Sequence, residues 1–230
     1  MWRSTVFATV GLLATAGTLS AQTPTQSPPA APPPAAEASN SPEPMEDVQT
    51  GDHWTYQVRD DITGDIKSTT TYTVTDASAS EISIRFSLLG NPSFGYQTFD
   101  RNWNLTNNGI WRITPNDGTG IRPPLAVGKN WSFKNVALNT KAGNSLKRSG
   151  TTKVVAQESV TTSAGTFDTF KIETTLQEDS AVDATKKLQL VQQTWYAPAI
   201  DHWVKRSSVT RLDGRVRDKN TMELVEYGRR

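Results

Sequence analysis

The chain alternates apolar and polar residues over most of its length from residue 47 onward. Alternation with many β-branched and aromatic residues is typical of strands buried on one face and wetted on the other, and such strands suit antiparallel pairing. No stretch keeps a sustained 3.6-residue period with helix caps, although residues 179–187 favour a short helix before Leu188–Val191 continue into a strand. The clearest runs are Trp54–Val58, Thr71–Thr75, Ile82–Phe86, Phe167–Ile172, Thr194–Tyr196 and Trp203–Lys205.

Turn residues separate these runs. Asp60–Asp65, Asn107–Gly109 and Asp213–Gly214 are expected to close hairpins, because Gly and Asn accept a positive φ. Residues 47–230 are enough for one domain with a sizeable core. The sequence therefore predicts a single all-β domain, a twisted antiparallel sheet that forms an open half-barrel or a partly closed barrel.

A motif of the form Gly-x-x-Trp-hydroxyl-aromatic occurs twice, at residues 51–56 and 128–133. Features downstream of each copy follow in the same order, which predicts two related β-meander halves at about 48–126 and 127–212 and a C-terminal hairpin over about 208–227. In this motif Gly relaxes a turn and Trp then carries a large apolar surface into the core. We expect Trp54 and Trp131 to be core residues rather than binding residues.

Residues 1–21 have the pattern of a cleavable secretory signal. Arg3 supplies a basic start, residues 4–18 are uncharged and apolar or small, and Ala21 is the small residue before the cut. The alternative is a transmembrane anchor, which takes about 20 strongly apolar residues. This stretch is shorter and rich in Ala, Gly and Thr, so we expect a soluble domain that is exported to the periplasm or secreted. No other segment is apolar enough to span a membrane.

Residues 22–46 contain no aromatic and no β-branched aliphatic residue and are rich in Pro and Ala. Such a segment cannot bury enough apolar surface to offset the entropy of ordering, so it predicts a disordered spacer. Its prolines favour a semi-rigid, extended chain. Two roles stay open for it: holding the domain away from a surface or partner, and serving as a passive tail.

The absence of cysteine excludes disulfides, thiolate zinc sites, cysteine nucleophiles and a cysteine-linked lipid anchor. Arg3 is one of the 24 Lys and Arg residues, so the chain after the signal carries 23 basic and 23 acidic residues. This balance argues against nucleic acid as a partner. The local basic cluster from Lys205 to Arg217 is interspersed with acidic residues, and we interpret it as a solvated hairpin face.

The two histidines, His53 and His202, each follow an Asp and precede a Trp. A metal site, an Asp–His pair or a hydrolase triad would need these side chains to converge, but neighbours in a strand face opposite sides. We therefore expect two unrelated surface histidines, no metal and no cofactor. The sequence lacks a G-x-S-x-G elbow, a phosphate-binding Gly loop, an EF-hand loop and a dinucleotide fingerprint. It predicts no catalytic residue and a non-enzymatic domain.

A further pattern consists of Pro-Leu-x-x-Gly-x-x-Trp at 124–131, Ser-Ala-Gly-Thr-Phe-Asp-Thr-Phe-Lys-Ile at 163–172, Thr-Trp-Tyr-Ala-Pro at 194–198 and Val-Lys at 204–205. Over about residues 120–210 it resembles a group of exported bacterial β-domains of unknown function, which are similar to the open half-barrels of periplasmic lipoprotein carriers. The resemblance implies a fold class and a compartment, and it implies no activity. The chain departs from the pattern at residues 201–203, where Asp-His-Trp replaces the usual Gly before Val-Lys.

The resemblance and the supply of tryptophan favour an exported domain that binds an apolar ligand, such as a lipid or a lipoprotein moiety, on a concave face. The alternative is an extracytoplasmic interaction or adhesion module that binds protein or polysaccharide through exposed aromatic residues. The direction in which the aromatic side chains point distinguishes the two, and the oligomeric state stays open. The candidate ligand-binding residues are Trp103, Trp111, Trp195, Tyr196 and Trp203.

Overall fold

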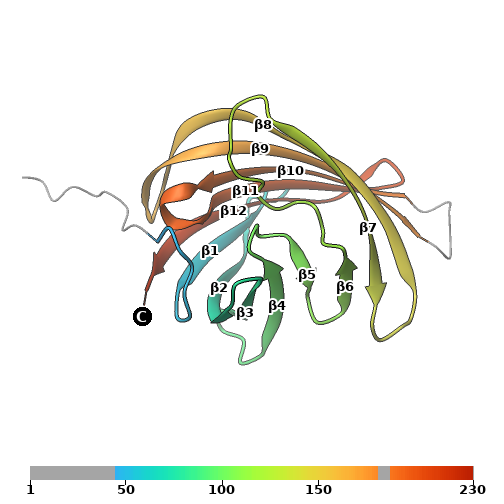
Figure 1. Ribbon diagram of the computed structural model, residues 1–230, viewed down its shortest axis with the longest axis horizontal. Coiled ribbons are helices and arrows are strands. Elements are labelled where there is room, and N and C mark those ends of the chain that lie inside the picture. The colour runs from blue at the N-terminus through green and yellow to red at the C-terminus, as the bar shows by residue number, and fades with distance from the viewer. Residues whose placement is uncertain (1–44, 181–186, 230) are drawn as a thin grey trace, which may run out of the picture. The chain divides into compact units, whose positions relative to one another are not determined.

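Residues 45–180 and 187–229 of the computed structural model form a closed barrel of twelve strands (Figure 1). They belong to one unit that spans residues 39–230. Every strand pairs antiparallel with its neighbours in sequence, and a 3₁₀ turn, η1, precedes β11. The elements are β1 (His53–Asp60), β2 (Ile66–Ala77), β3 (Glu81–Leu88), β4 (Phe94–Asp100), β5 (Leu105–Asn107), β6 (Trp111–Thr114), β7 (Asn130–Asn139), β8 (Ser145–Thr162), β9 (Gly165–Ser180), β10 (Lys187–Ala197), η1 (Pro198–Ile200), β11 (His202–Leu212) and β12 (Arg215–Gly228).

The barrel closes where β1 pairs with β12. His53 lies opposite Gly228 and Asp60 lies opposite Asn220, so the ladder runs the full length of β1. This pairing removes the two free sheet edges that an open half-barrel would leave. The predicted all-β antiparallel fold is thus confirmed, and of the two forms left open by the sequence the structure adopts the barrel.

The local signals in the sequence correspond to the observed elements. All six alternating runs lie within strands, and the three predicted hairpin turns lie between β1 and β2, β5 and β6, and β11 and β12. Asp213 and Gly214 have φ values of 51° and 78°, the two positive angles that a two-residue hairpin turn requires. The helix expected near 179–187 falls mainly outside the described residues, since β9 ends at Ser180 and β10 begins at Lys187.

The two Gly-x-x-Trp segments have the same backbone geometry. Gly51 and Gly128 have φ values of 98° and 93°, which an L side chain rarely adopts. The Gly51 N–H donates to the Val74 carbonyl at 2.9 Å, and the Gly128 N–H donates to the Val154 carbonyl at 2.9 Å. Both copies therefore lead into their strands, β1 and β7, through the same turn.

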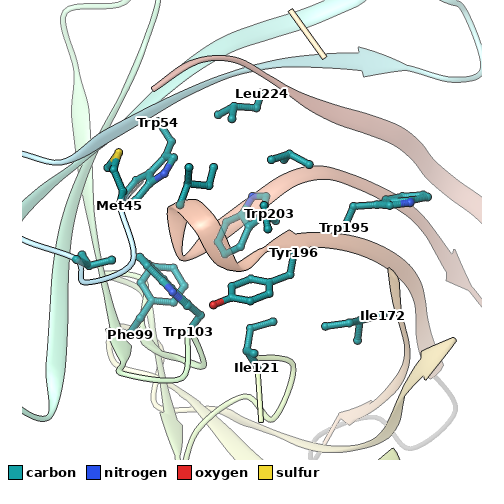
Figure 2. Close-up of a cluster of buried hydrophobic side chains, with 14 of the residues drawn as sticks. Met45, Trp54, Phe99, Trp103, Ile121, Ile172, Trp195, Tyr196, Trp203 and Leu224 are labelled. Carbon is teal, nitrogen blue, oxygen red and sulfur yellow. The ribbon is translucent and has the colours of Figure 1, made fainter. Parts of the chain in front are cut away.

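The core lies inside the barrel around Trp54, which is 0% exposed (Figure 2). Trp131 is 7% exposed, so both tryptophans of the repeated motif are buried as expected. Met45 is also fully buried, and its N–H donates to the Ala199 carbonyl at 2.6 Å. Ordered packing therefore begins before residue 47, the boundary expected from the sequence. The predicted signal at 1–21 and residues 22–44 of the predicted spacer lie outside the described residues.

Candidate ligand-binding cavity

His202, at the start of β11, is a fully buried histidine surrounded by aromatic rings. Its ring centroid lies 4.2 Å from that of Trp54, in a stacked arrangement, and 4.5 Å and 3.7 Å from those of Trp103 and Trp203. Its Nδ1 lies 2.5 Å from the Tyr56 hydroxyl oxygen. That hydroxyl donates its one hydrogen to the Trp203 carbonyl at 2.8 Å, so His202 Nδ1–H is the donor to Tyr56.

This arrangement leaves the Nε2 atom of His202 buried, with no hydrogen-bond partner in the part of the chain that the structure describes. Burial lowers the pKa of His202 well below its ordinary value, and the nearby Arg206 charge lowers it further. His202 is therefore a neutral side chain that packs among the core rings.

The expectation of two surface histidines is wrong for His202. Its side chain points into the barrel, where the core aromatics replace water around it. His53 is partly exposed, and its Nε2 lies 2.8 Å from Glu226 Oε1. The two histidines therefore have different partners and do not converge.

Asp201 does not orient the neighbouring histidine, because its carboxylate is bound elsewhere. Its carboxylate Oδ1 accepts hydrogen bonds from Trp103 Nε1 at 3.2 Å and from the Tyr196 hydroxyl at 2.6 Å. Its φ of 41° is left-handed, which turns the chain from η1 into β11. Burial raises the pKa of Asp201, while its two hydrogen-bond donors oppose that shift. Asp201 thus ties the Trp103 segment to β10.

A cavity of about 190 Å³ lies next to this aromatic cluster. Its walls come from β2, β4, β5, β8, β10, β11 and β12 and from the segments around residues 103 and 117–119, so it lies within the barrel. It is lined by Tyr72, Gln97, Phe99, Trp103, Leu105, Asp117, Thr119, Arg148, Leu190, Gln192, Trp203, Arg206 and Met222.

Two larger hollows, of about 460 and 320 Å³, are lined by residues of β7, β8 and β9, with Thr114 of β6 added in the larger one. Their walls come from one side of the barrel, whereas the cavity of 190 Å³ takes its walls from strands all around it. Binding sites in barrels of this size are built from inward-facing side chains. The internal cavity is therefore the better candidate site.

Arg206 supplies a positive charge to the cavity wall. Its guanidinium carbon lies 3.7 Å from the centre of the Trp203 ring, so the two groups stack, and its Nε donates to Thr194 Oγ1 at 3.2 Å. The side chain is half-buried, and this burial lowers the pKa of Arg206. A guanidinium nevertheless stays protonated at neutral pH. The cavity therefore contains a fixed cation held flat against an aromatic ring.

Two other charged residues of the wall already have partners. Asp117 accepts hydrogen bonds from the backbone N–H of Thr119 at 3.0 Å and from its hydroxyl at 2.5 Å, and burial raises the pKa of Asp117. Arg148 donates from Nε to Glu178 Oε1 at 2.8 Å, while its Nη1 is buried with no partner in the described part of the chain.

The structure brings three of the five sequence-predicted site residues together. Trp103 and Trp203 line the cavity, and Tyr196 pairs with Trp203 across β10 and β11. Trp195 lies on the opposite face of β10, apart from this cluster (Figure 2), and the ammonium groups of Lys171 and Lys205 cover its ring.

Trp111 is the fifth predicted residue and does not line the cavity. It is half-buried in β6, on the same face as the buried Ile113. Trp111 and Trp195 therefore lie outside the candidate site.

Arg206 is the functional candidate that the sequence pattern missed, because the cluster Lys205–Arg217 was interpreted as solvated. For Arg206 this interpretation is wrong. Tyr196 pairs with Trp203 but the preceding Trp195 pairs with Lys205, so Val204 forms a β-bulge. The bulge moves Lys205 to the outer face and Arg206 to the face of Trp203.

Comparison with protein families identifies a region that contains part of this site, five of the thirteen residues that line the cavity. Residues 128–208 match the DUF3108-like family model. The DUF3108-like segment runs from the start of the second Gly-x-x-Trp motif into β11, and it includes Trp203 and Arg206. The match confirms the resemblance to exported β-domains of unknown function over about residues 120–210. No curated protein sequence matches the chain.

Solved structures share the fold. A candidate lipoprotein from Parabacteroides distasonis superposes with a TM-score of 0.54 at 16% identity, covering 78% of this chain and 96% of that one. A candidate exported protein with a YmcC-like fold from Bacteroides fragilis gives 0.50 at 14% identity, covering 79% and 97%. The hypothetical lipoprotein YmcC of Escherichia coli gives 0.46 at 11% identity, covering 78% and 90%. At these identities the first two structures show a likeness in fold alone.

Within residues 45–180 and 187–229, no helix has the length and apolar character needed to cross a membrane.

Proposed function

We propose that this chain is a non-enzymatic, exported binding protein that takes the apolar part of a lipid-like ligand into the barrel. The observation that carries the proposal is the internal cavity of about 190 Å³ between the aromatic cluster and the strands opposite. Phe99, Leu105, Leu190 and Met222 supply an apolar wall to it. Small-molecule sites are typically concave and combine apolar walls with a few placed polar groups. This cavity has such an apolar wall together with a polar share of about equal size.

The expected export of the protein from the cytoplasm supports the proposal. Residues 1–21 have the pattern of a secretory signal, and the two structures with the better superposition are described as a candidate lipoprotein and a candidate exported protein. A domain outside the cytoplasm meets lipids and other envelope components. Such a domain that holds an apolar ligand needs an enclosed space rather than catalytic groups.

Replacing Leu190 with tryptophan is expected to weaken binding of a fluorescent medium-chain fatty acid at least tenfold. Leu190 lines the cavity, so the larger side chain occupies space that the ligand needs. The cost in folding free energy from overpacking is about 1–3 kcal/mol, which a typical domain tolerates. Binding is measured by fluorescence titration of delipidated protein, and native mass spectrometry before delipidation reports any ligand that co-purifies.

The matched control is Leu89→Trp, because Leu89 is 83% exposed in the turn between β3 and β4. This variant is expected to bind like the wild type. If delipidated wild-type protein takes up no fatty acid and no ligand co-purifies, the proposed function is incorrect. Equal weakening by both variants would place the ligand outside the cavity.

One observation favours the alternative of an adhesion or interaction module. Phe94 and Tyr96 of β4 are 56% and 55% exposed, and their rings contact each other with centroids 5.5 Å apart. Exposed aromatic pairs are suited to stacking on sugar rings or to burial against another protein. The double variant Phe94→Ser and Tyr96→Ser is expected to keep fatty-acid binding. A loss of retention on envelope polysaccharide in a pull-down, with fatty-acid binding intact, would support the alternative.

A further inference from the structure

The guanidinium of Arg206 is only partly satisfied by the protein. Its Nε donates to Thr194 Oγ1, and no further hydrogen bond or ion pair of this side chain exists within the described residues. Arg206 is half-buried and lines the cavity. A buried charge without a counter-ion is costly, and proteins retain such charges mainly where a ligand or partner completes them.

The neighbouring groups do not complete the hydrogen bonds of the guanidinium, although the negative charge of Asp117 acts on Arg206 from a distance. Asp117 is the acidic residue of the cavity wall, and its carboxylate is engaged by Thr119 rather than by Arg206. Glu178 pairs with Arg148. Burial raises the pKa values of Tyr56 and Tyr72, so these hydroxyls stay neutral beside Arg206. Because Glu178 balances Arg148, the remaining charges of the wall are Arg206 and Asp117, and the terminal nitrogens of Arg206, which have no hydrogen-bond partner among the described residues, are the groups that an anion can complete.

The geometry of the guanidinium indicates the class of anion. The Trp203 ring covers one face of the Arg206 guanidinium, with 3.7 Å between the ring centroid and Cζ, and Thr194 Oγ1 accepts the hydrogen bond from Nε. The two terminal nitrogens remain side by side in that plane, an arrangement that matches the two oxygens of a carboxylate. The same cavity offers Leu105, Leu190 and Met222 to an apolar chain.

The volume limits the size of the ligand. The cavity of about 190 Å³ is smaller than the roughly 300–1,000 Å³ that is typical of sites for drug-sized ligands. A carboxylate with a chain of medium length fits this space, and a bulky headgroup does not.

We propose that the cavity selects a small amphipathic carboxylate, whose carboxylate pairs with Arg206 and whose apolar chain lies among Leu105, Leu190 and Met222. The proposal rests on the proposed function, since it specifies the ligand class of the same cavity. Arg206 is then the residue that determines specificity, and Trp203 holds its guanidinium in place.

The test compares sodium octanoate with three relatives by titration calorimetry of the full chain. The relatives are 1-octanol, which lacks the charge, sodium acetate, which lacks the chain, and octyl phosphate, which carries a different anion. Wild-type protein is expected to bind octanoate at least tenfold more tightly than each of the others. In Arg206→Gln the preference for octanoate over octanol is expected to disappear while octanol affinity is unchanged. Arg217→Gln is the matched control, because Arg217 is exposed, and it is expected to behave as wild type.

The outcomes separate the two proposals. Equal binding of octanoate and octanol by the wild type overturns the role of Arg206 but leaves the apolar cavity in place. Tighter binding of octyl phosphate overturns the choice of carboxylate, and binding of acetate as tight as octanoate indicates a simple anion site. Binding of none of the four ligands overturns the proposed function as well. If Arg206→Gln does not fold, Arg206→Met retains the stem of the side chain without the charge, and the wild-type ratios decide the question by themselves.

Discussion

Replacing Trp54 with alanine is expected to lower the free energy of unfolding by about 3–5 kcal/mol. The side chain is 0% exposed, stacks on His202 and makes an edge contact with Trp103 at 5.7 Å between ring centroids. Its Nε1 has no hydrogen-bond partner in the described part of the chain, so the loss comes from packing and from the cavity left behind. Urea unfolding followed by circular dichroism measures the change.

Trp111 provides the matched control for this prediction. It is also a tryptophan on a strand, but it is half-buried, and the described structure contains no ring contact of Trp111. Trp111→Ala is expected to cost about 1 kcal/mol, as is usual for a substitution that leaves the core intact. Equal losses in the two variants would contradict the central position of Trp54 in the core.

Stability is expected to fall by up to about 2 kcal/mol between pH 7 and pH 5 because of His202. Burial holds the pKa of His202 well below its ordinary value in the folded state, whereas the unfolded side chain titrates near 6.5. As the pH falls through 6.5, the unfolded chain binds a proton that the folded chain does not bind. The contribution of neutral His202 to the free energy of unfolding is therefore fully present above pH 6.5 and is lost as the pH falls below 6.5.

His202→Phe removes this titration and keeps an aromatic ring against Trp54. The raised pKa values of Asp117 and Asp201 give a slope of opposite sign near their own titration range, but they are present in both proteins. The difference between wild type and variant, measured by urea unfolding at pH 7, 6 and 5, isolates His202. Parallel curves across these pH values would show that the pKa of His202 is the same in the folded and unfolded states, which would contradict the prediction.

The strands and turns were predictable because their signals are local. Alternation with a period of two marks a half-buried strand, and Asp213-Gly214 gives the two positive φ values that its hairpin needs. The closure of β1 on β12 was not predictable in this way. It joins Trp54 to Tyr227, and no local pattern specifies a pairing over that distance.

The candidate site was predictable only in its aromatic part. A supply of tryptophan suggests a core or a ligand platform, and Trp103 and Trp203 do line the cavity. Arg206 was missed because a single extra residue at Val204 reverses which side of β11 faces inward. Strict alternation from Trp203 would have placed Lys205 in the cavity. His202 was missed because polar residues are usually exposed, and only its aromatic neighbours explain its burial.

The pairing of β1 with β12 also determines when folding can be completed. All other strand pairs join neighbours in sequence, so their closure costs less chain entropy than the pairing of β1 with β12, and we expect them to form first. The free side of β1 can pair only when β12 (Arg215–Gly228), the last strand of the barrel, is in place. Until that strand arrives, β1 and β11 each present a row of unpaired N–H and C=O groups, on which strands of other molecules can assemble. The period of greatest exposure to aggregation is therefore expected to last until β12 pairs with β1 and closes the barrel.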